Sequence, residues 1–220
     1  MKYFISLLVF LLVETNLKSQ DINKLINQVK SKLEKINRYE ANGTMKTTIA
    51  YLKIPIAKVK VYFKKPNEIS IQSNSGVTFI PKGVNAISLQ NILSNDFTVI
   101  DGGRETVKQK VLRVIKLLPN SSNSNIVLST VYINETDLVV EKSSTTTKEE
   151  GTYEMEMQYG KYIQYGLPDK LIFTFNAKDY KIPKGLTLDF DNSSRKNEKV
   201  NTAMLNKGKA EIVFQQYKIN

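Results

Sequence analysis

The chain has 220 residues, of which 41% are hydrophobic, and it carries a formal net charge of +11 with no histidine and no cysteine. This length fits one large domain or two small ones, and the hydrophobic fraction is sufficient for a core. The composition excludes a histidine general base, a thiolate nucleophile, a disulfide and the common zinc ligands. We therefore expect no enzyme, no bound metal and no cofactor.

The first segment, residues 1–20, has the layout of a secretory signal peptide. Lys2 supplies a positive charge, the run from Phe4 to Val13 is apolar and uncharged, and a more polar stretch follows. This run is too short for a permanent membrane anchor, and the alternative is a short buried helix. We predict cleavage near Lys18 to Asp21 and a single mature domain, residues 21–220, in a bacterial periplasm. Without a cysteine, this domain has no lipid-attachment site.

The positive charge does not indicate nucleic-acid binding. The lysines alternate with apolar residues or are scattered, and no basic run carries interleaved aromatic residues. A diffuse positive field instead favours anionic lipid surfaces. We predict no nucleic-acid partner.

The segment from Asp21 to Tyr39 is predicted to form an amphipathic helix. Its apolar residues recur every three or four positions and therefore share one face. These residues are Ile22, Leu25, Ile26, Val29, Leu33 and Ile36. The dipeptide Asn42-Gly43 is interpreted as the break after this helix.

Alternation with a period of two then predicts strands, and the clearest lies between Ala57 and Lys64. Its odd-numbered residues are apolar, whereas its even-numbered residues are lysine or tyrosine. Side chains alternate between the two faces of a strand, so this segment has one apolar and one polar face. The apolar face covers either a packed core or an open cavity.

Other segments extend this pattern along the chain. Met45, Ile49 and Tyr51 share one side of the preceding segment, and Ile69 and Ile71 continue the pattern after it. Further strands are predicted at residues 77–80, 97–100, 105–118, 126–133, 138–142, 152–159, 171–175 and 210–217, with turns at 101–103, 119–125 and 134–136. Together they predict roughly eleven antiparallel strands in a sandwich or barrel. Residues 176–208 receive no assignment.

Two groups of acidic residues suggest chemistry only weakly. Glu154 and Glu156 share one strand face, and paired carboxylates can cleave glycosides. That face is the polar one, so solvation of both groups is the better explanation. Asp189, Asp191 and Asn192 resemble part of a calcium loop, but the required glycine and terminal glutamate are missing.

The order of these segments resembles the periplasmic outer-membrane lipoprotein carrier (LolA-like) family. A helix is followed by an alternating strand that ends in Lys65-Pro66-Asn67, similar to the family's Arg-Pro pair. Ser75-Gly76, a short aromatic strand and Pro81 resemble the next hairpin. "VIKLLPN", "VYINETDLVVEK", "YGLPDKLIFTF" and "IVFQQYKIN" resemble the later strands. Each motif is weak by itself, but their order covers nearly the whole mature chain.

The resemblance implies a mainly β fold: an incomplete antiparallel barrel of eleven strands with an N-terminal helix and a short lid helix. Its apolar interior would shield the acyl chains of lipoproteins during transfer to the outer membrane. The implied partners are acylated lipoproteins or other lipids, an inner-membrane release complex and an outer-membrane acceptor, and we expect a monomer. The cavity would be lined by Val59, Val61, Phe63, Ile69, Ile71, Tyr153, Met155 and Met157.

The implied lid lies between Gly83 and Asn95, where Val84, Ile87, Ile92 and Leu93 indicate a short helix or a partly ordered loop. Lys65 would hold this lid closed. The family has arginine here, whose planar fork can bind several carbonyls, whereas lysine is a point donor. Lys65 is therefore either a weaker latch or a solvated charge.

Two other functions are compatible with the same sequence. One is a carrier or sensor for another lipid or amphiphile, built on the same barrel. The other is a structural β-domain without a ligand. An apolar cavity shows no preference for a headgroup, so the sequence does not identify the lipid.

Overall fold

The computed structural model describes residues 22–49, 54–66, 68–73, 88–94, 96–149, 151–176 and 207–220. These residues form an N-terminal helix at 22–34, the short helix α2 (Leu89–Ser94), the 3-10 turn η1 (Ile163–Tyr165) and ten strands. The strands are β1 (Arg38–Ile49), β2 (Ala57–Lys64), β3 (Glu68–Ser73), β4 (Phe97–Val107), β5 (Lys110–Pro119), β6 (Ile126–Asn134), β7 (Val139–Thr147), β8 (Gly151–Gln158), β9 (Lys170–Asn176) and β10 (Lys207–Ile219).

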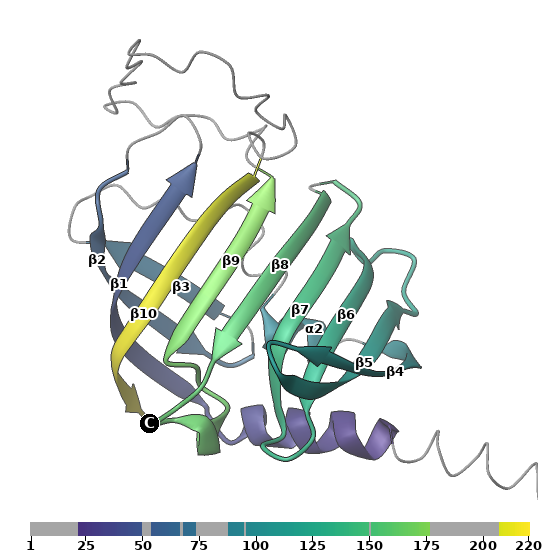
Figure 1. The fold of residues 1–220 in the computed structure, drawn as a ribbon. Helices are drawn as coiled ribbons and strands as arrows, with labels where there is room; N and C mark the ends of the chain where they lie inside the picture. Colours follow the sequence, from purple (N-terminus) through teal and green to yellow (C-terminus); the bar gives the residue numbers. More distant parts are fainter. Residues whose placement is uncertain are drawn as a thin grey trace, which may run out of the picture.

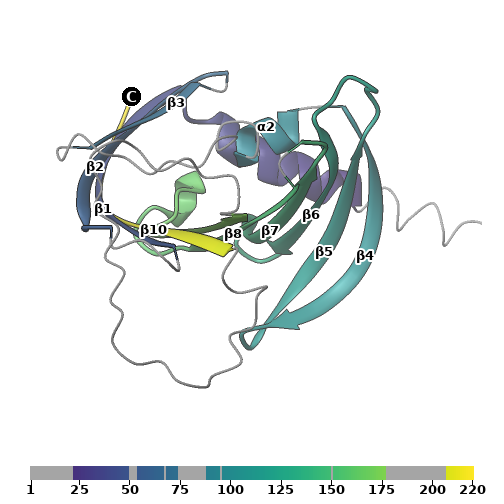
Figure 2. The same ribbon diagram turned by 90° about the horizontal axis from the view of Figure 1, so that it is seen from above.

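The ten strands form one antiparallel sheet in the order β3-β2-β1-β10-β9-β8-β7-β6-β5-β4. Figure 1 shows the sheet with the N-terminal helix along one end of its strands. Seen from above in Figure 2, the sheet curls, and the N-terminal helix and α2 lie on its concave side. The end strands β3 and β4 do not pair with each other, so the described sheet is an open barrel. The predicted mainly β fold with an N-terminal helix is confirmed.

The N-terminal helix is held on the sheet by its predicted apolar stripe. Leu25, Val29 and Leu33 are each at most 8% exposed and pack in the same cluster as Ile115 and Val131 of the sheet. Burying one such side chain contributes about 1.5–3 kcal/mol. The stripe therefore fixes the helix against the concave face.

The helix ends earlier than its sequence pattern predicts. It extends to residue 34, and β1 begins at Arg38, so Ile36 lies in the connection. Asn42-Gly43 is not a break between elements but an irregularity inside β1, where the register with β10 shifts. A Cβ atom at Gly43 would lie 2.6 Å from the carbonyl oxygen of Val213. Glycine is needed there because the two backbones approach closely.

The predicted turn at residues 101–103 is also wrong. β4 continues through these residues to Val107, with a register shift relative to β5 between Asp101 and Arg104. Gly103 has a φ of 81°, which glycine adopts without steric cost. The chain reverses at Lys108-Gln109 instead, where both residues have positive φ. A glycine pair therefore marks a bulge here, and the turn itself has no glycine.

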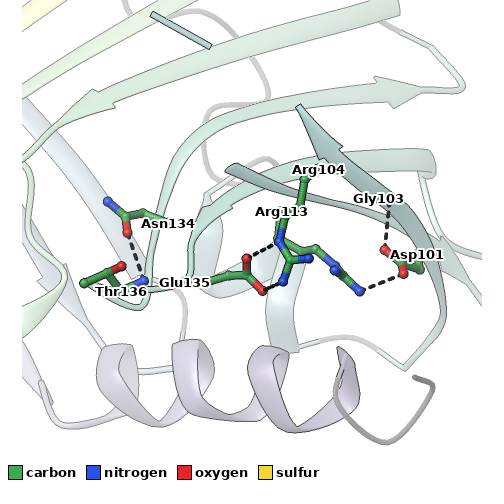
Figure 3. Close-up of polar contacts among 7 residues, drawn as sticks. All are labelled: Asp101, Gly103, Arg104, Arg113, Asn134, Glu135 and Thr136. Atoms are coloured by element: carbon green, nitrogen blue, oxygen red, sulfur yellow. Dashed lines mark hydrogen bonds and ion pairs between the residues drawn. The ribbon is translucent and has the colours of Figure 1, made fainter. Parts of the chain in front are cut away.

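The turn predicted at residues 134–136 is confirmed. The Asn134 side-chain oxygen accepts a hydrogen bond from the backbone N–H of Thr136 at 3.0 Å (Figure 3). It also accepts one from the backbone N–H of Asp137 at 3.1 Å. Asparagine favours turns because its side chain can bond to the backbone two residues later.

Several predictions fall outside the described residues: the strand at 77–80, Tyr51, Val84 and Ile87. The helix expected between Gly83 and Asn95 is present as α2. Among the described residues, no helix has the length and apolarity needed to span a bilayer.

Candidate functional site

The concave side of the sheet contains a cavity of about 110 Å³. Its wall comes from the N-terminal helix, the start of α2, the segment after η1 and strands β1, β2, β3, β8, β9 and β10. The lining residues are Leu33, Tyr39, Val61, Ile69, Ile71, Ser88, Leu89, Met155, Met157, Gly166, Leu167, Pro168, Leu171, Ile212, Phe214 and Tyr217. Segments far apart in the sequence therefore meet around one apolar space.

Strand alternation explains why β2 contributes to this wall. Val59, Val61 and Phe63 are each at most 4% exposed, whereas Lys58 and Lys60 on the other face are exposed. Strand pairing continues the apolar face sideways, because Val61 lies opposite Ala41 of β1 and Ile71 of β3. The face assignment made from the sequence is correct for this strand.

Five of the eight residues predicted for the cavity line it: Val61, Ile69, Ile71, Met155 and Met157. The other three are buried but pack elsewhere. Val59 contacts the cluster of Met45, Ala57 and Ile212, and the ring of Phe63 stacks on Tyr39 at 5.3 Å between centroids. Tyr153 stacks on Phe173 at 5.4 Å. Alternation identifies the inner face of a strand, but it does not tell which positions along that face border an open space.

Several wall residues were missed by the sequence reasoning. Leu33 belongs to the predicted helical stripe, and Ile212 and Phe214 belong to a predicted strand. The sequence pattern therefore indicated that these residues are buried, but not that they line the cavity. Leu167 and Pro168 follow η1, where no periodic pattern exists. Gly166 has a φ of 67° and lies against the Leu33 side chain, so this turn closes on the helix.

The two lid residues that the structure describes, Ile92 and Leu93, lie in the core. Ile92 is 0% and Leu93 is 4% exposed, and both pack in the main apolar cluster of the protein. Ser88 and Leu89, at the start of α2, contribute to the cavity wall. This helix therefore covers part of the concave side.

The Lys65 ammonium contacts a different element from the one expected. Its Nζ atom donates a hydrogen bond to the carbonyl oxygen of Glu34, and its backbone N–H donates to the carbonyl of Asn37 at 2.9 Å. The last carbonyls of a helix lack partners within it and carry partial negative charge, so a lysine there is favourable. Within residues 88–94 the structure gives Lys65 no hydrogen bond. Residues 83–87 and 95 of the expected lid lie outside the described residues, so a hold of Lys65 on the lid stays a prediction, and its observed partner is the N-terminal helix.

The described cavity wall has no charged side chain. Burial raises the pKa of Tyr39 to about 12 and raises the pKa of Tyr217 further, beyond its usual range. The Tyr217 hydroxyl donates to the carbonyl oxygen of Pro168 at 2.6 Å. These groups stay neutral at physiological pH, so the wall suits an uncharged, apolar ligand.

The paired carboxylates suggested by the sequence lie outside the cavity wall. Glu156 forms an ion pair with Lys108, and Glu154 lies on the same face of β8. The buried residues of β8 alternate with them and face the core. The arrangement is that of a solvated outer face with ion pairs.

Neither the protein-family models nor the curated proteins give a match to this sequence. Solved structures do. A domain assigned to outer-membrane lipoprotein sorting from Vibrio parahaemolyticus matches with a TM-score of 0.56 at 7% identity, over 90% of this chain and 91% of that one. A LolA superfamily protein from Nitrosomonas europaea matches with a TM-score of 0.57 at 9% identity, over 90% and 93%. The chain has the LolA-like fold.

A DUF1329 family protein from Desulfovibrio piger is similar as well, with a TM-score of 0.52 at 8% identity over 90% of this chain and 92% of that one. The LolA-like fold agrees with the resemblance found in the order of the sequence motifs. At these identities the similarity establishes the fold alone.

Proposed function

We propose that this chain is an exported carrier that shields the acyl chains of lipoproteins, or of a related lipid, in the cavity on the concave face of its sheet. The chain would act in the periplasm and transfer its ligand from an inner-membrane release complex to an outer-membrane acceptor. The signal-like first twenty residues support export. No catalytic step is part of this proposal.

The observation that carries the proposal is an open space whose described wall is apolar and uncharged. A packed core would fill this position, because protein interiors leave few voids larger than a water molecule. A space of this kind contributes to stability only when an apolar ligand occupies it. The cavity lies on the concave side of the curled sheet, next to the N-terminal helix and α2 (Figure 2).

The free-energy gain from shielding an acyl chain is large. Each buried methylene contributes about 0.8 kcal/mol, so a chain of about fifteen methylenes would cost on the order of 12 kcal/mol to expose to water. Spontaneous crossing of an aqueous compartment is very slow at that cost. A protein that buries the chain removes most of this barrier.

The cavity is small relative to a complete acyl chain. Its volume of about 110 Å³ is only a few times the roughly 30 Å³ that one water molecule occupies in the liquid. A full-length chain would therefore have to widen it. Met155 and Met157 lie in the wall, and methionine side chains adapt readily because they are unbranched and have three rotatable bonds.

Binding of a neutral, environment-sensitive naphthalene dye tests the proposal. We expect blue-shifted fluorescence on addition of the protein, and loss of this signal when a long-chain acyl ester is added. Dye uptake without displacement at saturating ester would contradict a lipid cavity. Absence of both uptake and lipid binding would favour a structural domain without a ligand.

A further inference from the structure

The wall of the cavity contains one phenol hydroxyl that has a fixed position but forms no hydrogen bond with the described residues. Among the described residues, the Tyr39 hydroxyl has no hydrogen-bond partner, although Tyr39 lines the cavity. The Tyr217 hydroxyl in the same wall already donates to the carbonyl of Pro168. The Tyr39 hydroxyl oxygen is not among the fully buried polar atoms without a partner, so part of its surface is accessible; Tyr39 borders this cavity and also a second hollow beside Arg38 and Tyr62.

The position of this hydroxyl is fixed by the rings around it. Tyr39 stacks on Phe63 with ring centroids 5.3 Å apart and an angle of 25° between the planes. It also meets Tyr217 edge to face, at 5.4 Å and 70°. Aromatic pairs in these arrangements are favourable. Tyr39 also lies in β1, paired with Phe63 of β2 and Ile219 of β10, so its backbone is held on both sides.

We propose that the Tyr39 hydroxyl donates a hydrogen bond to an uncharged carbonyl of the bound lipid, so that the site selects acyl esters and amides over free fatty acids. This inference rests on the proposed lipid-binding function and specifies the ligand class of the same cavity. It makes Tyr39 a specificity-determining residue.

The argument against a free carboxylate is electrostatic. The described wall offers no lysine or arginine to pair with it, and burying an unpaired ionised carboxylate is very unfavourable. An ester or amide carbonyl is neutral and needs only one donor. A burial-raised pKa of about 12 keeps the Tyr39 hydroxyl protonated, and so available as a donor, at neutral pH.

The argument against a plain hydrocarbon is one of unsatisfied hydrogen bonding. An alkane that displaces water from the cavity leaves the Tyr39 hydroxyl without any partner. A buried polar group in that state is destabilising. An acyl ester of the same length buries equal hydrocarbon and satisfies the hydroxyl, so it binds more tightly.

The test compares three ten-carbon ligands in dye displacement at pH 8: methyl decanoate, decane and decanoate. For the wild-type protein we expect methyl decanoate to bind most tightly and decanoate most weakly. Tyr39→Phe keeps both ring contacts and should weaken methyl decanoate by about 3–10-fold while leaving decane unchanged or tighter. Tyr62→Phe removes a phenol hydroxyl from the opposite face of β2 and is the matched control.

Each other outcome overturns the inference in a recognisable way. If Tyr39→Phe weakens all three ligands equally, Tyr39 serves only packing. If decanoate binds the wild-type protein as tightly as its ester, the site does not select uncharged carbonyls, although lipid binding itself stands. If none of the three displaces the dye, the proposed carrier function fails and the inference falls with it. Circular dichroism melting of Tyr39→Phe separates these results from misfolding.

Discussion

The Lys65 ammonium donates a hydrogen bond to the carbonyl oxygen of Glu34, and so joins the residue after β2 to the C-terminal end of the N-terminal helix. The backbone N–H of Lys65 bonds to Asn37 in the following connection. Two parts of the cavity wall, Leu33 on the helix and Val61 on β2, are thereby held relative to each other. We predict that this contact controls opening, because the helix lies on the concave side that a lipid has to enter.

Replacing Lys65 by leucine should loosen this helix. The lost bond is partly solvent-exposed, so we expect a decrease in the free energy of unfolding of only about 0.5–1 kcal/mol. Amide hydrogen exchange in residues 22–34 should accelerate more than exchange in β5 to β8, and release of bound lipid to acceptor vesicles should change in rate. Exchange measured by mass spectrometry, with a parallel release assay, provides the check.

Lys64→Leu is the control for this prediction. Lys64 is adjacent in sequence but exposed on the outer face, where it lies 3.8 Å from Glu68. Its replacement should leave helix exchange and lipid release at wild-type values. Equal behaviour of both variants would show that Lys65 is only a surface charge.

A valine-to-phenylalanine pair on β2 distinguishes an open cavity from a packed core. Val61 lines the cavity, whereas Val59 is 3% exposed and packs against Met45, Ala57 and Ile212. Overpacking a filled site costs about 1–3 kcal/mol. We therefore expect Val59→Phe to destabilise the protein by that amount, and Val61→Phe to be nearly neutral because its ring enters existing space.

The two substitutions should affect ligand binding in the opposite order from their effects on stability. Val61→Phe should reduce dye uptake strongly, since it fills the cavity, while Val59→Phe should keep most of it. Urea unfolding and dye titration on both variants are the measurements. Equal destabilisation by the two substitutions would mean that the site at Val61 is as filled as that at Val59.

Loss of the ion pair between Arg113 and Asp101 is predicted to destabilise the protein more than loss of the neighbouring pair between Arg104 and Glu135. Arg113 is 8% exposed and its Nη2 atom lies 2.7 Å from Asp101, whereas Arg104 bonds to Glu135 at 2.8 Å with both side chains more exposed (Figure 3). Asp101→Ala leaves a buried guanidinium donor without its partner and should cost about 1–3 kcal/mol. Glu135→Ala breaks the exposed pair and should cost about 0–1 kcal/mol.

Thermal or urea unfolding of the two variants tests this order. Arg113→Met removes the buried charge altogether and should be tolerated better than Asp101→Ala, because the Nε atom of Arg113 already lacks a partner among the described residues. If Asp101→Ala proves as mild as Glu135→Ala, water reaches Arg113 and compensates its charge.

The stability of the protein at high pH should depend on Tyr39. Burial raises its pKa from about 10, the value expected in the unfolded chain, to about 12 in the folded protein. Because the pKa is higher in the folded protein, the protonated hydroxyl contributes to the free energy of unfolding. This contribution is complete below pH 10 and is lost as the pH rises through 12. Tyr39→Phe has no such group, so its free energy of unfolding should fall less steeply than that of the wild type between pH 10 and 12. Parallel slopes would contradict the burial of the hydroxyl.

The sequence predicted strand content well because alternation is a local signal. The apolar face of β2, the alternation of β8 and the helical stripe at Leu25 to Leu33 are all present in the structure. The two mistaken boundaries, at Asn42-Gly43 and Asp101-Gly102-Gly103, share a cause. Glycine allows both turns and bulges, and only the neighbouring strand decides between them.

The cavity was predictable only in part, because it depends on distances between elements. Val61 and Val59 have the same sequence environment, yet one borders open space and the other does not. The wall at Leu167 and Pro168 comes from a turn with no periodicity, positioned by the contact of Gly166 with Leu33. Such contacts join residues more than a hundred positions apart, which no local pattern records.

Photo-crosslinking with a decanoyl ester that carries a diazirine at the end of its chain tests the central claim most directly. The account predicts crosslinks on cavity residues such as Val61, Met155 and Leu171, and their loss when unlabelled ester is added in excess. Mass spectrometry of the digested protein identifies the labelled peptides. Crosslinks confined to exposed apolar side chains such as Ile56 and Val111, at 67% and 62% exposure, and unaffected by unlabelled ester, would contradict the claim that the concave cavity holds an acyl chain.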